Sequence, residues 1–344
     1  MIFGPVLLAE AEGAILAHSV KTGTGRLRKG AVLTQQDLAV LSKAGVTSVT
    51  VARLGPHDVA EDIAAAQLAA ALVPDPTGQR LALSVAFTGR VNLNAVGPGI
   101  VEIDSTAIHA LNRIDPAITL ATLAPWTRVV KGTLAGTVKI ITYGVDRTAL
   151  GRACRLAAAA IRVRPVNRQT AGLILTEVPG QDPKISVKSR RAVEARLRAL
   201  GITMAGVEVV AHDEGAIAVA LARLPGQLLL ILTGSATSDL HDTAPEGLRV
   251  AGGVVQRFGM PVDPGNLLFL GTLEGRPVIG LPGCARSPAL NGADWVLERL
   301  ACGLTLTDDD IAAMGVGGLL KEIPIRPQLR EPGDLPSDDD QSET

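Results

Sequence analysis

Aromatic side chains are nearly missing from this chain. Phe, Trp and Tyr make up 2% of its 344 residues, although 47% of the residues are hydrophobic. The cores must therefore be built from Ala, Val, Leu and Ile. Binding of single-stranded nucleic acid, which depends on aromatic stacking platforms, is disfavoured. A net charge of −1 also removes the broad positive field that attracts nucleic acid. A small anionic ligand held by a local site stays compatible with this composition.

Cysteines and long apolar runs are scarce as well. Cys154, Cys284 and Cys302 are widely spaced and form neither a CxxC pair nor a disulfide framework. Such usage is typical of a reducing compartment. No run of about 18 uncharged apolar residues could span a bilayer. The apolar N-terminus lacks the basic leader of a secretory signal and carries Glu10 and Glu12. We therefore expect a cytoplasmic protein with no membrane partner.

Changes of pattern divide the chain into four expected segments. Residues 1–75 predict a small α/β unit, in which Thr34 caps a helix that leads to a strand. Residues 76–150 begin at the VPDPTG linker and consist of short, β-rich, barrel-like segments. From 151 to 330, apolar strands alternate with helices, which predicts a three-layer α/β domain with an open, mostly parallel sheet. Residues 331–344 hold six acidic residues and no basic one, which is typical of a disordered tail.

Three polar loops follow strands of the predicted sheet. They are TEVPG (176–180), TGSATSD (233–239) and GLPGCARS (280–287). In open parallel sheets, ligands bind beyond the carboxyl ends of the strands. Loops of small residues let backbone N–H groups approach an anion, and a following helix N-terminus favours negative charge there. One such loop is equally consistent with a tight turn, but several at one sheet edge predict a binding site.

Carboxylates complicate the second loop. Asp239 and Asp242 would repel a bare phosphate, so they indicate either a metal ion, with these two residues as ligands, or a ligand edge rich in hydrogen-bond donors. His241, between Leu240 and Asp242, is either an acid/base group or a surface histidine. No HxH or HExxH spacing predicts a zinc site.

The ordered motifs resemble a known family. A strand ending in T-E, then LTGSATSD, PVDPGN, a Glu-Gly turn and PVIGLPGCARSP are similar to the molybdopterin-binding domain of molybdenum-cofactor biosynthesis proteins. That domain, of MoaB/Mog-like type, occurs in the molybdopterin molybdotransferases. The forms GMPVDPGN, GLPGCARSP and NGADWVL are more similar to a branch often fused to a molybdenum cofactor cytidylyltransferase domain. The resemblance covers about residues 170–323, and residues 14–63 are also similar to that branch.

The resemblance implies a pterin site with three walls. Its ligand would be molybdopterin, in free or adenylylated form, or the finished molybdenum cofactor, with Mg²⁺ and molybdate as co-substrates. Asp239 and Asp242 would take the catalytic and metal-binding positions. The implied cofactor-binding residues are Glu177, Thr233, Gly234, Ser235, Ala236, Thr237, Ser238, Pro264, Gly265, Asn266, Pro282, Gly283, Cys284, Ala285, Arg286 and Ser287.

Departures from the family pattern leave the activity open. Asn266 stands where molybdotransferases tend to have lysine, the first loop lacks a full T-G-D-E sequence, and the second loop is a residue shorter. The chain is therefore expected to be either a molybdotransferase-like transferase that assists molybdate insertion or a non-catalytic carrier. No cytidylyltransferase domain follows in this sequence, so a carrier would hand cofactor to a separate cytidylyltransferase or molybdoenzyme. A homodimer is the family expectation.

Cys284 and Arg286 of the third loop each have two possible roles. A helix start and Arg286 would both lower the pKa of the Cys284 thiol. No histidine lies near it in sequence to act as a base, which favours a contact or packing role over a catalytic thiolate. Arg286 is expected to bind phosphate through its guanidinium, and the alternative is a salt bridge to Asp294 or Glu298.

Overall fold

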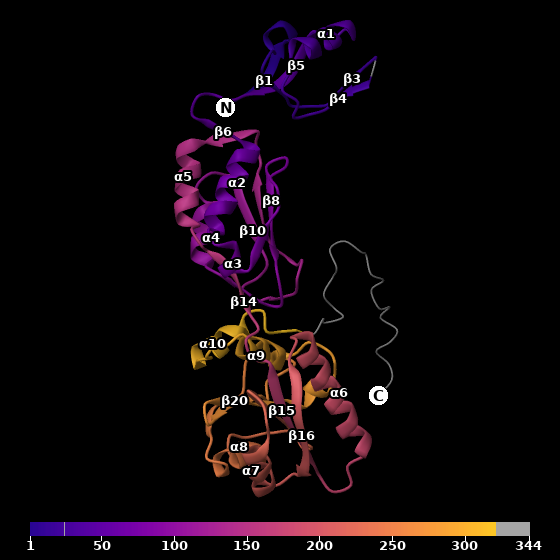
Figure 1. Cartoon of the computed structure of the whole chain (residues 1–344), viewed down its shortest axis with the longest axis vertical. Coiled ribbons are helices and arrows are strands. Elements are labelled where there is room, and N and C mark those ends of the chain that lie inside the picture. Colours follow the sequence, from indigo (N-terminus) through magenta and orange to yellow (C-terminus); the bar gives the residue numbers. More distant parts are fainter. Residues whose placement is uncertain (24, 321–344) are drawn as a thin grey trace, which may run out of the picture. The chain divides into compact units, whose positions relative to one another are not determined.

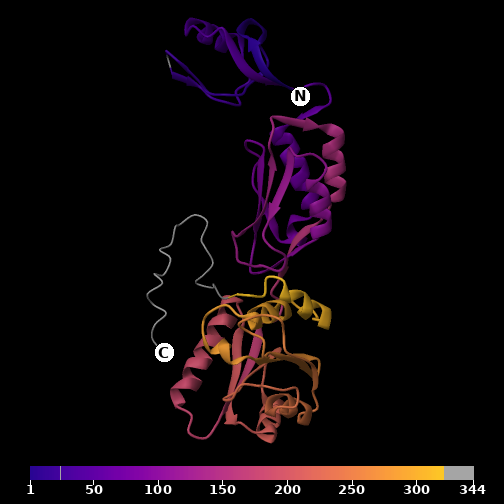
Figure 2. The ribbon, with the colours of Figure 1, turned by 180° about the vertical axis from the view of Figure 1, so that it is seen from behind.

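A computed structural model describes residues 1–23 and 25–320 of the chain (Figures 1 and 2). The chain divides into two compact units. Unit 1 is Met1–Asn167 with Ala301–Gly303, and unit 2 is Arg168–Leu300 with the described residues from Leu304 onward. The acidic segment 331–344 lies outside the described residues. Within residues 1–23 and 25–320, no helix combines the length and apolarity that crossing a bilayer requires.

The first part of unit 1 is a small α/β layer. Its antiparallel sheet has the order β1-β5-β2, and a β-hairpin and the helix α1 complete it. A capping box between Thr34 and Asp37 starts α1, as expected from the sequence. Leu16, Leu41 and Val51 are among its buried core residues. The elements are β1 (Ile2–Leu7), η1 (Leu8–Glu10), β2 (Ile15–Leu16), β3 (Val20–Thr22), β4 (Gly25–Leu27), α1 (Gln35–Lys43) and β5 (Ser48–Arg53).

The rest of unit 1 has one larger core. Small antiparallel sheets and the helices around them supply its side chains. The sheet orders are β10-β12-β8-β7, β11-β9-β14 and β13-β6. The elements are β6 (Asp58–Ala60), α2 (Glu61–Leu72), α3 (Pro76–Gln79), β7 (Leu81–Leu83), β8 (Arg90–Ala95), β9 (Gly99–Ile103), α4 (Ser105–Asn112), β10 (Ile118–Thr122), β11 (Arg128–Val129), β12 (Leu134–Ile140), β13 (Gly144–Asp146), α5 (Arg147–Leu156) and β14 (Ile161–Pro165).

The third expected segment begins within α5, a helix that packs in the core of unit 1. That segment was expected to begin at residue 151 and to belong to the domain with the parallel sheet. Instead α5 ends at Leu156 and β14 begins at Ile161, and both elements supply side chains, such as Ala153 and Ile161, to the core of unit 1. The chain reverses at Ala159, which adopts a left-handed φ of 55°. Alanine gives no sequence signal for such a turn, so the break was not expected.

Unit 2 contains a six-stranded sheet with the order β16-β15-β17-β20-β19-β18. The first four of these strands run parallel, and β19 and β18 are antiparallel to their neighbours. The fold class predicted from the sequence, an open and mostly parallel α/β sheet, is confirmed. The strands are β15 (Thr170–Glu177), β16 (Thr203–Ala211), β17 (Leu228–Leu232), β18 (Val254–Phe258), β19 (Phe269–Leu273) and β20 (Arg276–Leu281).

Helices cover both faces of this sheet (Figures 1 and 2). On one face, Ile174 of β15 packs in a core with side chains of α7 (Glu214–Arg223) and α8 (Thr243–Val250). On the other, α6 (Pro183–Ala199) packs on β15 and β16, and an ion pair joins it to α9 (Gly292–Ala301). All five side chains of β17, LLLIL, are buried, as a central strand between two helix layers requires. Full burial of one such side chain is worth about 1.5–3 kcal/mol. The segment after α9 holds α10 (Asp308–Ala312) and η3 (Ala313–Gly315).

Parallel pairing sets the position of the predicted loops. Because β15, β16, β17 and β20 run in one direction, the segments that follow them leave the sheet at a single edge. We call this the carboxyl edge of unit 2. It receives the loops that begin after Glu177, Ala211, Leu232 and Leu281.

Candidate functional site

The first and second predicted loops meet at Gly234. Its backbone N–H donates a 2.8 Å hydrogen bond to Oγ1 of the buried Thr176. A Cβ at position 234 would lie 2.7 Å from the Thr176 carbonyl oxygen and 2.7 Å from Oε1 of Gln181. Glycine is therefore needed here to let the two loops pack together. The Glu177 carboxylate turns toward α6 and accepts a 2.5 Å hydrogen bond from the Ser186 hydroxyl.

His212, which the sequence analysis did not single out, belongs to the same edge. It follows β16, and its Nδ1 lies 2.9 Å from Oγ1 of Thr176. Its backbone N–H donates to the carbonyl of Glu177 at 3.0 Å. The signal that could have found it is its position directly after a parallel strand.

The carboxylates of the second loop hold that loop together. Asp242 caps α8: its Oδ1 accepts from the backbone of Thr243 at 2.7 Å, and its Oδ2 accepts from the backbone of Ser238 at 2.8 Å. Burial raises the pKa of Asp242, but these hydrogen bonds outweigh burial and hold the pKa below its usual value. Asp239 accepts from the backbone of His241 at 2.8 Å through Oδ1.

These bonds bear on the predicted metal site. Across the described part of the chain, no group of three or more His, Cys, Asp or Glu residues could hold a metal ion. Magnesium usually keeps several waters and takes one or two carboxylates together with substrate phosphates. The recorded hydrogen bonds use both oxygens of Asp242 but only Oδ1 of Asp239. A metal role for this pair stays a prediction, and Asp239 is the better-placed ligand of the two.

The second loop mixes buried and exposed positions. Thr233 and Thr237 are buried, whereas Ser235, Ala236 and Ser238 are exposed. The Thr233 and Thr237 side chains therefore pack inward, and the exposed residues are the ones that an incoming ligand can reach.

Arg286 joins the third loop to the second. One terminal nitrogen of its guanidinium donates to the carbonyl oxygen of Thr233. Its Nε is buried and has no hydrogen-bond partner in the described structure. Burial alone lowers the pKa of this half-buried side chain, and no neighbouring charge compensates. The alternative salt bridge to Asp294 is not formed, because Asp294 pairs with Arg196 at 2.6 Å.

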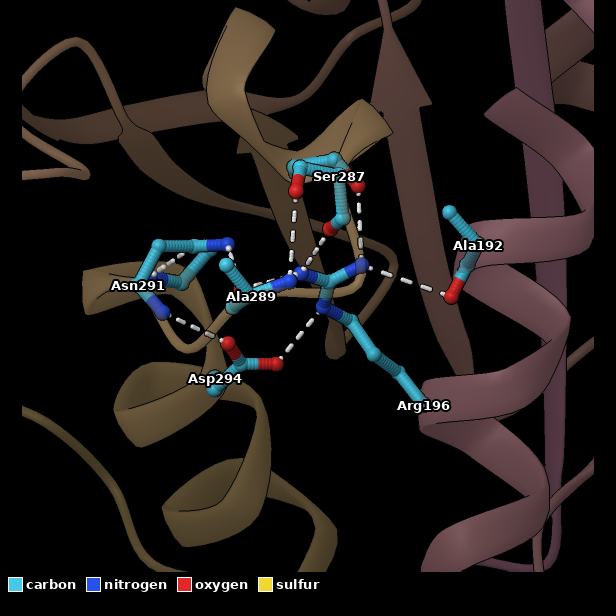
Figure 3. A network of polar contacts seen from close by, with 8 residues as sticks. Ala192, Arg196, Ser287, Ala289, Asn291 and Asp294 are labelled. Carbon is cyan, nitrogen blue, oxygen red and sulfur yellow. Dashed lines mark hydrogen bonds and ion pairs between the residues drawn. The ribbon is translucent and has the colours of Figure 1, made fainter. Parts of the chain in front are cut away.

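Arg196 of α6 fastens the third loop to that helix (Figure 3). Its side chain is 9% exposed, and its Nε donates to Oδ1 of Asp294 at 2.6 Å. The two terminal nitrogens donate to the carbonyl oxygens of Ala192 (3.3 Å), Ala285 (2.8 Å), Ser287 (2.7 Å) and Ala289 (3.0 Å). Its five N–H donors thus match five acceptors. Sequence reasoning missed Arg196, although a charge beside Val193 and Leu197 on the buried face of a helix was a usable signal.

The turn at 263–266 packs against the start of α9. Gly265 has a φ of 140°, and a Cβ there would lie 2.5 Å from the backbone nitrogen of Gly292. That nitrogen donates to the carbonyl of Pro264 at 2.8 Å. The Asn266 side chain is exposed, while the Asn266 carbonyl accepts from Met260 at 3.1 Å. The turn therefore packs on the chain at Gly292, just beyond the third loop.

Cys284 is not an activated thiol. Its loop forms a short 3₁₀ helix, η2 (Gly283–Arg286), and α9 begins only at Gly292. Burial raises the pKa of the Cys284 thiol, and the carboxylates of Asp263 and Asp294 add to this, whereas the charge of Arg196 opposes it. The expected lowering of this pKa is wrong, because burial disfavours the thiolate, the helix start lies further along the chain, and carboxylates lie nearby. The structure favours a packing or contact role.

Comparisons with known proteins identify little of the chain. A domain of unknown function (DUF8806) matches residues 5–53, within the first part of unit 1. No curated protein matches.

Solved structures match at low similarity. The molybdopterin biosynthesis MoeA protein from Pyrococcus horikosii is 12% identical, with a TM-score of 0.29, and the match covers 88% of this chain and 76% of that one. The CinA protein of unknown function from Thermoplasma acidophilum is 15% identical, with a TM-score of 0.26 and coverage of 35% and 91%. The molybdopterin biosynthesis enzyme MoaB from Thermus thermophilus is 17% identical, with a TM-score of 0.26 and coverage of 44% and 99%. A likeness this weak carries no inference about the function of this chain.

Proposed function

We propose that unit 2 binds an anionic pterin of molybdenum-cofactor biosynthesis at its carboxyl edge. The ligand is molybdopterin in its free or adenylylated form. The observation that carries the proposal is Arg286, a half-buried cation with no compensating charge and with a buried, unbonded Nε. A buried donor without an acceptor costs about 1–3 kcal/mol. A phosphate group would supply both the missing acceptor and the missing charge.

The order of motifs along the chain supports the pterin over other small anions. The segments TGSATSD, PVDPGN and PGCARSP, which resemble those of molybdopterin-binding domains, lie in loops that the structure joins to one another or to the adjoining helix start. Arg286 bonds Thr233 of the first segment, and Pro264 of the second accepts from Gly292. The exposed residues of TGSATSD lie between the Arg286 contact and the capping Asp242, where backbone N–H groups can approach a ligand.

Two versions of this function differ in chemistry. In the transferase version, Mg²⁺ and molybdate are co-substrates, and Asp239 with Asp242 holds the metal beside the ligand phosphate. In the carrier version, the protein binds the pterin and delivers it to a separate cytidylyltransferase or molybdoenzyme. The capping bonds of Asp242 and the asparagine at position 266 favour the carrier version.

Equilibrium binding tests the site itself. Adenylylated molybdopterin is titrated into the wild-type chain, Arg286→Gln and a control, Arg276→Gln. Arg276 starts the strand that Arg286 follows, so the control removes a guanidinium from the opposite end of β20. A hydrogen bond to a charged group is worth about 1.5–3 kcal/mol, so Arg286→Gln should bind roughly tenfold to a hundredfold more weakly. Equal affinity of the two variants would show that the site lies elsewhere.

Turnover separates the two versions. The protein is incubated with adenylylated molybdopterin, Mg²⁺ and molybdate, and AMP release is followed. AMP release that Asp239→Asn abolishes supports the transferase. Tight binding without AMP release supports the carrier.

A further inference from the structure

Unit 1 contains a cavity that the proposed pterin site does not use. Its volume is about 350 Å³, and its lining includes Glu102, Asp104, Trp126, Ala159 and Arg162. Ligand pockets range from about 300 to 1,000 Å³, so this one suits a small molecule. All of these residues belong to unit 1, and the carboxyl edge of the sheet belongs to unit 2. The cavity and the proposed pterin site therefore share no residue.

Two of the lining residues adopt an unusual backbone conformation. Trp126 has a φ of 66° and Ala159 a φ of 55°. At most of its positive-φ positions this chain uses glycine, which carries no penalty there. A side-chain-bearing residue in this region costs roughly 1–3 kcal/mol, and such residues cluster at ligand sites. Backbone bonds from Trp126 to Val101 (2.6 Å) and from Ala159 to Ala71 (3.1 Å) hold the two conformations.

On the charged side of the cavity, the guanidinium of Arg162 has hydrogen-bond donors that Glu102 does not use. Glu102 accepts hydrogen bonds from Nε of Arg162 and, at 2.6 Å and 3.1 Å, from Nε and a terminal nitrogen of Arg164. Burial raises the pKa of Glu102, but these two arginines outweigh it and lower the pKa to about 2. The carboxylate is thus ionised and already occupied. Arg162 lines the cavity, and its recorded bond uses only Nε, which leaves its terminal nitrogens for another acceptor.

We propose that this cavity binds a small planar anion. An aromatic or heteroaromatic ring would stack on Trp126, and a phosphate or carboxylate on that ring system would bind Arg162. Stacking of a base on an aromatic side chain is worth about 1–3 kcal/mol. The terminal nitrogens of a guanidinium match the two oxygens of a phosphate or carboxylate. The chain has only two tryptophans and 2% aromatic residues, and one of those tryptophans stands at this cavity in a strained conformation.

Fluorescence of Trp126 tests the proposal. In a Trp295→Phe background, Trp126 is the only tryptophan, so its emission reports on the cavity. The full chain is titrated with two matched pairs of probes: AMP with adenosine, and nicotinate with nicotinamide. Ribose 5-phosphate serves as an anion without a ring. We expect saturable quenching by AMP, by nicotinate or by both, and at least tenfold weaker binding of each uncharged partner and of ribose 5-phosphate.

Paired arginine variants supply the control. Arg162→Gln should weaken binding about tenfold or more, because it removes the anion's partner. Arg164→Gln should leave binding unchanged, since Arg164 pairs with the same Glu102 but does not line the cavity. Quenching by AMP shows that the anion is a phosphate, and quenching by nicotinate that it is a carboxylate. The proposal is overturned if neither anion quenches, if adenosine and nicotinamide bind as well as the anions, or if the two arginine variants lose binding equally.

Discussion

Replacing Arg196 should loosen the third loop and destabilise unit 2. The change Arg196→Met keeps a long apolar stem but removes every hydrogen bond that joins α6 to residues 285–289 and to Asp294. The Arg196 side chain is 9% exposed and the Asp294 side chain is 12% exposed, so water can replace little of the lost ion pair. The variant leaves a nearly buried carboxylate and several carbonyl groups without their donor.

The expected loss is large for a single substitution. Removing one partner of a buried ion pair costs about 3–5 kcal/mol. We expect the loss of unfolding free energy in Arg196→Met to lie near the lower end of this range, because Asp294 also accepts a hydrogen bond from the backbone of Asn291 at 2.8 Å. Arg196→Lys keeps the charge but offers three donors without the planar fork, so about half of the loss should remain.

Urea unfolding measures this loss in unit 2 alone. In a Trp126→Phe background the remaining tryptophan, Trp295, follows Asp294 on α9 and reports on the affected region. The control is Arg198→Met, two residues further along α6 at an exposed position, where a change of less than about 0.5 kcal/mol is expected. If Arg196→Met and Arg198→Met unfold at the same urea concentration, Arg196 does not hold the loop in solution.

Three further predictions concern a thiol, a carboxylate and a glycine. Cys284 should react with iodoacetamide more slowly in the folded than in the urea-unfolded chain at neutral pH, because its raised pKa leaves less thiolate; faster labelling of the folded chain, measured by peptide mapping, would contradict this. The pKa of Glu102 is lowered to about 2, so its ionised form stabilises the fold. This stabilisation is complete above the unfolded-state pKa and is lost as the pH falls from about 4.5 toward 2. Glu102→Gln should therefore be less stable than wild type at pH 7, and the gap should close near pH 2; a gap independent of pH would refute it. Gly265→Ala should cost more than about 2 kcal/mol in urea unfolding, since its Cβ would meet Gly292 at 2.5 Å, whereas Gly252→Ala, with a φ of 84° and open space, should cost about 1 kcal/mol; equal losses would show that the contact is not made.

Local patterns sufficed to predict the sheet of unit 2. Apolar strands, of which LLLIL is one, alternate with helices in the sequence, and this alternation predicted parallel pairing. The helix that Thr34 caps was likewise readable, because a capping box depends on residues three apart. The reversal at Ala159 was not, because the left-handed conformation there is imposed by tertiary contacts and not by a glycine.

The site could be predicted only in part, because several of its contacts are tertiary and have no local sequence signal. Strand direction alone brings Thr176, Gly234 and Arg286 to one edge, and the structure joins these loops by direct contacts. The roles of Arg196 and His212 depend on partners 36 or more residues away in the chain, which no local spacing shows. The pKa of Cys284 depends on burial and on carboxylates that approach it, and both arise only in the folded state.

The most direct test of the central claim is the dissociation constant of adenylylated molybdopterin for Arg286→Gln, measured beside Arg276→Gln. An anion-binding carboxyl edge predicts a roughly tenfold to hundredfold higher constant for Arg286→Gln and a wild-type value for Arg276→Gln. Wild-type affinity in Arg286→Gln, or an equal loss in both variants, would contradict it.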